Sequence, residues 1–198
     1  MGIRCFWCEE TDRVQRYLRR YHADCSAPWR WLNGMVEFDQ AVRPPRTYHD
    51  ATDRPHDLVP RDDPRWPRQC DCGRVFQGLD SWQVFTERIY RRADTGAELV
   101  LRPAPEGAMW DAWWSPDCYK GADGRSLMVM CPGGHEWMID SKASNCTMKD
   151  DWTHRCWVRH GEPPNITVDK NGITCAAGAG SILTANWHGF LRAGELVE

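Results

Sequence analysis

The pattern of apolar and polar positions predicts a chain built mostly of β-strands. From residue 74 onward, short apolar runs alternate with clusters of turn residues, which is typical of antiparallel hairpins. Asn-Gly, at 171–172, is the strongest short hairpin signal in the chain. We predict hairpins joining 81–92 to 97–102, 125–130 to 135–140 and 166–169 to 173–175, followed by strands at 182–185, 188–192 and 195–197.

Two segments have a spacing that favours helix. Between residues 11 and 22, apolar side chains recur at positions i, i+3, i+4 and i+7, namely Val14, Tyr17, Leu18 and Tyr21. This spacing predicts a short amphipathic helix, and a strand is the alternative for the same segment. Residues 105–114 favour one or two helical turns. The predicted fold class is therefore α+β with β dominant.

The chain divides by composition into two parts. Residues 40–68 are rich in charges and prolines, which predicts an extended, irregular connection. So long a loop is either functional or clamped at its ends. We predict a zinc-knuckle segment with a long proline-rich loop at 1–78 and a β-rich domain at 79–198.

Composition narrows the classes of function and environment. The chain has 198 residues and a formal net charge of −3, which excludes a globally basic coat for nucleic acid but not a local basic patch. No apolar stretch is long enough for a membrane-spanning helix, and the first residues do not resemble a secretory signal. We therefore expect a reducing compartment, where the 10 cysteines would be metal ligands or buried thiols rather than disulfides.

Two close cysteine pairs predict a structural zinc site. Cys5 and Cys8 form a Cys-x-x-Cys pair, and Cys70 and Cys72 form a tighter pair followed by Gly73, which suits a sharp turn. Four thiolates in tetrahedral geometry would close the site and clamp the first seventy-odd residues. The alternatives are reduced, partly buried cysteines, or a redox pair for which the βαβ context is missing. The zinc reading gives the fold an N-terminal zinc-ribbon-like knuckle.

A second candidate metal cluster lies near the C-terminus. Its residues are Cys146, His154, Cys156 and Cys175. If 154–160 is a strand, residues 154 and 156 share one face and form one side of a site. The order and spacing of these residues match no established zinc signature. Buried cysteines with solvent-facing histidines, or a disulfide, are the alternatives.

The arginines between residues 13 and 30 could bind nucleic acid. Arg13, Arg16, Arg19 and Arg20 are interleaved with aromatic residues, a combination that suits phosphate contact and base stacking. A solvated face with the aromatic rings in the core is the alternative. No catalytic motif is complete, since the His135-Glu136 pair lacks the further ligands of known zinc enzymes. We expect a non-catalytic protein, although a cysteine–histidine nucleophile or a metal-assisted hydrolase at 154–160 stays open.

Segments at both ends of the chain resemble a group of viral proteins. The segments are 5–8 with 19–21, 154–161, 175–182 and 188–196, and they resemble uncharacterised accessory proteins encoded by tailed bacteriophages and prophages of high-GC hosts. The resemblance implies no catalytic activity. It implies a structural or interaction protein, located in the virion or the host cytoplasm, that binds a protein partner such as another phage protein. A zinc-ribbon accessory factor that binds nucleic acid is the alternative.

Overall fold

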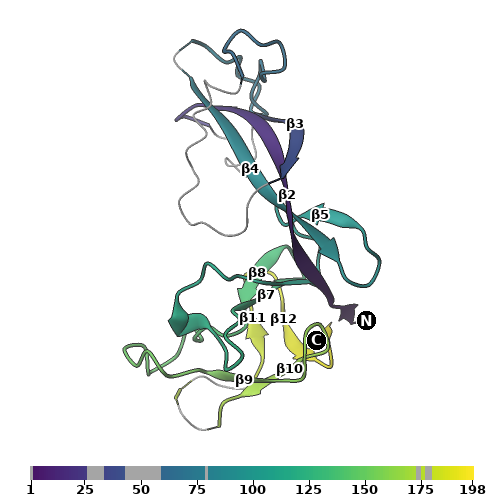
Figure 1. The fold of residues 1–198 in the computed structure, drawn as a ribbon. Helices are drawn as coiled ribbons and strands as arrows, with labels where there is room; N and C mark the ends of the chain where they lie inside the picture. The colour runs from purple at the N-terminus through teal and green to yellow at the C-terminus, as the bar shows by residue number, and fades with distance from the viewer. Residues whose placement is uncertain (1, 26–33, 43–58, 79, 173–174, 177–179) are drawn as a thin grey trace. The chain divides into compact units, whose positions relative to one another are not determined.

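The chain folds into two compact units. The computed structural model describes all residues except 1, 26–33, 43–58, 79, 173–174 and 177–179 (Figure 1). Unit 1 comprises Met1–Glu10 and Tyr90–Glu198, and unit 2 comprises Thr11–Ile89. This division differs from the predicted one at residue 78, because the first ten residues belong with the C-terminal part. Much of the predicted proline-rich loop, at 43–58, lies outside the described residues.

Strands dominate both units. Unit 2 contains most of β2 (Phe6–Tyr21), β3 (Met35–Val42) and most of β4 (Ser81–Arg92). Unit 1 contains the ends of β2 and β4 together with β1 (Ile3–Arg4), β5 (Glu98–Val100), β6 (Ala108–Asp111), β7 (Leu127–Cys131), β8 (His135–Met138), β9 (Trp157–His160), β10 (Thr167–Lys170), β11 (Ile182–Leu183), β12 (His188–Arg192) and β13 (Glu195–Val197). The β-dominant class with antiparallel sheets is thus confirmed.

The helical part of the predicted fold class is wrong for the described residues, whose one helical segment is the short 3-10 turn η1 (Asp117–Tyr119). Residues 11–21 belong to β2, and the 105–114 segment contains β6. The spacing misled because Val14 and Leu18 are four residues apart, which places two side chains on one face of a strand as well as of a helix. Both are buried, whereas Tyr21 is exposed. Within the described part of the chain, no helix is long and apolar enough to cross a membrane.

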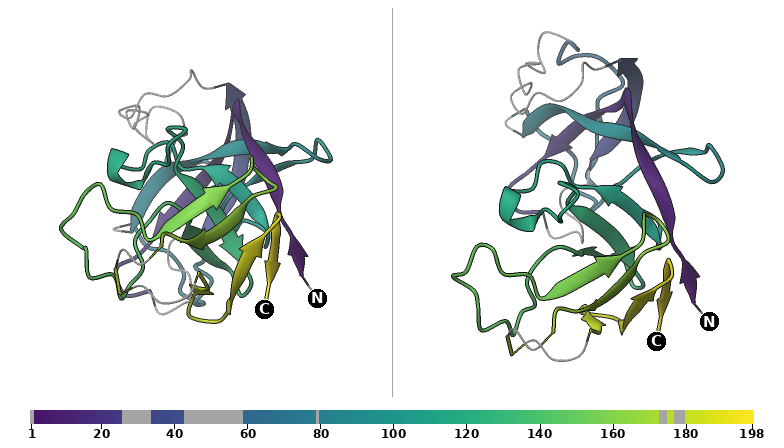
Figure 2. Two further views of the ribbon diagram at one scale, coloured as in Figure 1. Left: turned by 90° about the horizontal axis from the view of Figure 1, so that it is seen from below. Right: turned by 60° about the horizontal axis from the view of Figure 1, so that its bottom comes forward.

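Unit 1 is built from three groups of paired strands. One sheet has the order β1-β13-β12-β11, so the two ends of the chain lie side by side (Figure 2). β9 pairs antiparallel with β10. β6 lies between the start of β2, to which it is parallel, and β7, which continues to β8. Buried side chains from all three groups form the main core of the unit.

Most of the hairpins predicted from turn residues are found in the structure. The predicted pairing of 125–130 with 135–140 is confirmed as β7 and β8, and the last two predicted strands are β12 and β13. β4 also pairs with β5 as expected. The third hairpin differs, because β10 pairs with β9, which precedes it in the chain. Of its predicted returning strand, residues 173–174 lie outside the described residues.

Unit 2 is a smaller sheet over a small core. β3 runs antiparallel to β2, with a shift of register between Arg16 and Tyr17, and β4 is the other neighbour of β2. The main buried cluster in the described part consists of Leu18, Val59 and Trp66, and Val14, Phe76 and Ile89 are buried outside it. Trp66 packs edge-to-face on Trp82 with their ring centroids 5.0 Å apart. A core this small contributes limited hydrophobic stabilisation.

Candidate metal centres

Centre A is a group of four potential ligands in unit 2: His22, Cys25, Cys70 and Cys72. One ligand atom from each lies within 4.8 Å of the others. His22 follows directly after the end of β2, and Cys25 lies three residues further on. The other two residues come from a turn much later in the sequence. The group therefore joins two distant segments of unit 2.

The turn at 70–73 has the tight geometry that its sequence predicts. The backbone N–H of Gly73 donates to the carbonyl of Cys70 at 2.8 Å, and the N–H of Cys70 donates to the carbonyl of Arg74 at 2.8 Å. Gly73 has a φ of 89°, a conformation that favours glycine. Gln69 and Val75 pair across the base of the turn. Both thiols of the Cys-x-Cys pair thereby lie on one short, constrained loop.

The distances in centre A fit tetrahedral coordination. The Sγ atoms of Cys25 and Cys70 are 3.5 Å apart, and Cys72 Sγ is 3.3 Å from His22 Nε2. With zinc–sulfur bonds of about 2.3 Å and zinc–nitrogen bonds of about 2.0 Å, tetrahedral ligand atoms are separated by roughly 3.5 to 3.8 Å. Disulfide sulfurs would be about 2.05 Å apart, and no described cysteine forms a disulfide.

The surroundings of centre A are apolar and cationic. His22 is buried and packs edge-on against Phe76, and the guanidinium of Arg20 lies over the rings of Phe76 and Trp82. Burial raises the pKa of the Cys70 thiol to about 11. At neutral pH this thiol keeps its proton unless a cation stabilises the thiolate, which is what a bound metal does.

Cys5 and Cys8 are not partners of Cys70 and Cys72 in centre A, which corrects the predicted ligand set. Cys5 packs in the main core of unit 1 and Cys8 in a second core cluster of that unit. Cys8 lies inside β2, so the chain makes no knuckle turn there. Along an extended chain, residues three apart face opposite sides. The two thiols therefore diverge, and burial raises their pKa values to about 12 for Cys5 and about 11 for Cys8.

Centre B lies in unit 1 and consists of the four residues that the sequence singled out as a second cluster: Cys146, His154, Cys156 and Cys175. One ligand atom from each lies within 4.8 Å of the others. Cys156 Sγ is 3.8 Å from Cys175 Sγ and 3.6 Å from His154 Nε2. These separations match the tetrahedral values given above, and three of the four residues are buried.

Backbone N–H groups point at the sulfurs of centre B. Ala143 donates to Cys156 Sγ and Met148 donates to Cys146 Sγ, both at 3.3 Å. Such bonds stabilise thiolate charge and orient the ligands of a metal. Without a cation, burial raises the pKa of Cys156 to about 12. The backbone donors of centre B therefore favour the thiolate form of its cysteines.

The loop that carries Cys146 is held by one lysine. Lys142 Nζ donates to the carbonyls of Met148, Lys149 and Asp151 at 3.0, 2.7 and 2.7 Å. The loop is also joined to the segment of Cys175, since Ala176 N donates to Thr147 Oγ1 at 3.1 Å. The chain is therefore already shaped around centre B by contacts that involve no metal.

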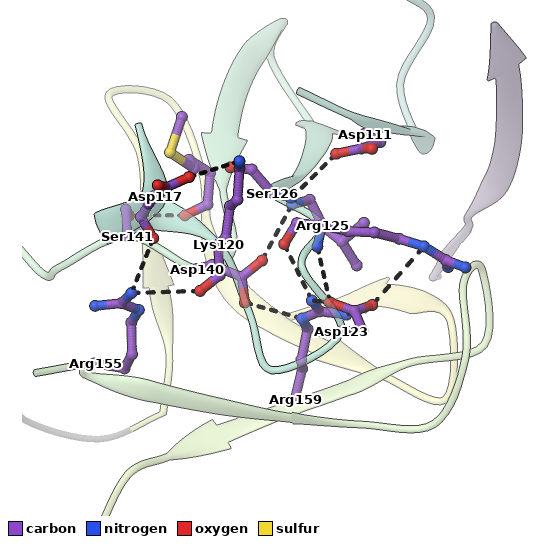
Figure 3. A network of polar contacts seen from close by, with 12 residues as sticks. Asp111, Asp117, Lys120, Asp123, Arg125, Ser126, Asp140, Ser141, Arg155 and Arg159 are labelled. Atoms are coloured by element: carbon purple, nitrogen blue, oxygen red, sulfur yellow. Dashed lines mark hydrogen bonds and ion pairs between the residues drawn. The ribbon is translucent and has the colours of Figure 1, made fainter. Parts of the chain in front are cut away.

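Two arginines anchor the segment that contains His154 and Cys156 (Figure 3). Arg155 donates to the carbonyls of Asp117 and Lys120. Arg159 donates through Nε to Asp140 at 2.9 Å and also pairs with Asp123. Although burial opposes it, hydrogen bonding to Arg159 lowers the pKa of Asp123, whereas burial raises that of Asp140. This network fixes β9 and thereby centre B.

The four arginines proposed for nucleic acid are engaged within unit 2. Arg16 forms an ion pair with Asp39, and Arg13 donates to Gln40. Arg19 lies over the ring of Tyr21. Arg20 is buried and donates to the carbonyls of Pro67 and Gln77. These contacts give the arginines a structural role in the unit, and Trp29 and Trp31 of the same stretch lie outside the described residues.

Sequence reasoning missed His22 and Cys25 as candidate ligands. Their His-x-x-Cys spacing was a usable signal, because it resembles the pair spacing of zinc ligands. Both centres combine three cysteines with one histidine, and either could hold a metal ion. Comparison with protein family models, curated proteins and solved structures finds no match to this chain.

Proposed function

We propose that the protein is a non-catalytic scaffold with one structural zinc ion in each unit, and that it works by binding another protein. The observation that carries this proposal is the pair of separate three-cysteine, one-histidine groups at tetrahedral spacing. Thiolate and imidazole ligands in this number are the usual donors of structural zinc.

The composition of the two centres supports a structural role. Four protein ligands fill the tetrahedral positions, whereas catalytic zinc keeps one position for water or substrate. Neither group includes a carboxylate. When bound, each zinc would supply folding free energy rather than a reactive centre.

The loop of centre B supports protein binding. Trp152, between His154 and Cys146 in the sequence, is 73% exposed, and Met148 of the same loop is also exposed. Large apolar side chains on a loop fixed by metal are suited to protein contact, because little ordering entropy is lost on binding. The phage or prophage setting, and a location in the virion or host cytoplasm, rest on the sequence resemblance alone.

Metal analysis tests the proposal. Protein purified without added metal is denatured, and its metals are measured by mass spectrometry together with chain concentration. We expect two zinc ions per chain. A folded protein that contains no zinc, or that contains a different metal in both centres, would contradict the proposal.

A further inference from the structure

A pocket in unit 1 lies beside centre B and is separate from its ligands. Its volume is about 470 Å³, within the range of small-molecule sites. Trp137 of β8 and Trp157 of β9 line it together with residues 141–145 and with Ser181, Leu183 and His188. Leu183 and His188 are cross-strand neighbours of β11 and β12.

The lining of the pocket is fixed by contacts already described. Ala143 donates its N–H to Cys156 Sγ, so the 141–145 part of the lining is tied to a ligand of centre B. Trp137 and Trp157 pack against the main core, with ring centroids 5.4 Å apart and planes at 90°. The two indoles therefore form a rigid corner. A preformed site of this kind loses little entropy on binding.

We propose that this pocket binds a neutral sugar ring. One side of a pyranose is lined with C–H bonds, which are attracted to the negative face of an indole, and its rim carries hydroxyl groups. The pocket offers both kinds of partner: two tryptophans, and the polar side chains of Ser144, Ser181 and His188 in its lining. The proposal goes beyond the zinc scaffold, although one part of the lining is tied to a ligand of centre B.

Charge selects the sugar over other flat ligands. Among the described residues that line the pocket there is no aspartate or glutamate, so a cationic ligand finds no counter-ion there. Lys142 is the one lysine or arginine among these residues, and its Nζ already donates to three backbone carbonyls. The phosphate of a nucleotide would therefore meet no lysine or arginine in this lining whose donors are not already engaged. A neutral, hydroxyl-rich ring requires neither.

Saturation-transfer NMR on the whole protein tests the proposal. The probes are the methyl glycosides of glucose, galactose, mannose and N-acetylglucosamine, each at about 10 mM, which detects millimolar dissociation constants. Adenosine monophosphate is the competing probe. The expected result is transfer to at least one glycoside and none to the nucleotide.

Three variants locate the binding. Trp137→Leu removes one indole while keeping an apolar side chain against the core, and Ser144→Trp fills the pocket from an exposed position of its lining. Trp114→Ala is the matched control, because Trp114 is an exposed tryptophan of the same unit outside the lining. We expect the signal to disappear in both pocket variants and to persist in the control. No transfer from any glycoside, transfer from the nucleotide in their place, or a signal that survives Ser144→Trp would overturn the proposal.

Discussion

Centres A and B have the same donor set but hold different kinds of structure. In centre A, Cys25 and Cys70 are separated by 45 positions in the sequence, so a metal held by the group would join the turn at 70–73 to the end of β2. In centre B, Cys156 and Cys175 are 19 positions apart, and the surrounding loop has its own network of hydrogen bonds. The same four ligands thus act as a long-range clamp in one unit and as a local brace in the other.

The two units also differ in the size of their buried cores. The largest buried cluster of unit 1 has a dozen residues, whereas that of the described part of unit 2 has three, Leu18, Val59 and Trp66, with a few further apolar side chains buried outside it. Small domains that cannot bury enough apolar surface commonly depend on a metal or cross-links. The comparison teaches that the same donor set can matter unequally for the stability of two units. The smaller the buried core of a unit, the larger the share of its folding free energy that a bound metal would have to supply.

The largest expected effect comes from removing one ligand of each centre. Cys70→Ser should unfold unit 2, since structural zinc in small modules contributes roughly 10 kcal/mol or more. Cys156→Ser should leave the core of unit 1 folded and loosen the 141–156 loop. Hydrogen exchange followed by mass spectrometry measures protection in each unit, and metal analysis should give one zinc per chain for either variant. Equal loss of protection in both units would contradict the comparison.

A second test removes the arginine that anchors the segment of centre B and leaves the candidate ligands unchanged. Arg159→Met leaves Asp140 buried without its ion pair, which should cost about 3 kcal/mol of unfolding free energy in unit 1. Urea denaturation measures the loss. Arg155→Met is the control with a smaller expected effect, because the hydrogen bonds of Arg155 to described residues go to backbone carbonyls and leave no buried carboxylate unpaired when they are lost. If both variants cost the same, the ion pair with Asp140 is not the main anchor.

A third test asks whether Cys8 is a buried thiol of the core or a metal ligand. Cys8→Ala should retain two zinc ions per chain and cost about 1 to 2 kcal/mol, because it leaves a small cavity in the second core cluster of unit 1. Zinc content and urea denaturation measure the two effects. The loss of one zinc in this variant would restore Cys8 as a ligand and remove the assignment of centre A.

The smallest effect is expected at exposed apolar side chains next to each centre. Trp152→Ala, beside centre B, and Val75→Ala, beside centre A, should each change the unfolding free energy by less than about 0.5 kcal/mol. Thermal denaturation checks this. A larger loss in Trp152→Ala would show that this side chain stabilises the loop instead of being presented to a partner.

The sequence predicts local features of this fold better than distant ones. The β7–β8 and β12–β13 hairpins follow from turn residues next to their strands. The pairing of β1 with β13 joins opposite ends of the chain, and no local pattern encodes it. The 11–22 segment was misjudged because a spacing of four residues fits both helix and strand.

The two candidate centres also differ in how well the sequence predicts them. The residues of centre B lie within a short stretch of sequence and could be grouped by type and spacing. In centre A the two halves are far apart in the sequence, and the Cys5-x-x-Cys8 motif belongs to the other unit, where Cys8 lies inside β2. A Cys-x-x-Cys motif aims both thiols at one ion only where the backbone turns, and that depends on pairing elsewhere in the fold.

The discontinuity of unit 1 has a consequence for synthesis on the ribosome. Unit 2 is encoded without interruption at Thr11–Ile89, so all ligands of its clamp have been translated before most of unit 1 exists. β1, in contrast, finds its partner only when β13 emerges as one of the last segments of the chain. At about 5 to 20 residues per second, the first strand waits roughly ten seconds or more for its neighbour. Translation order therefore makes the smaller unit, which carries centre A, the first to be completed.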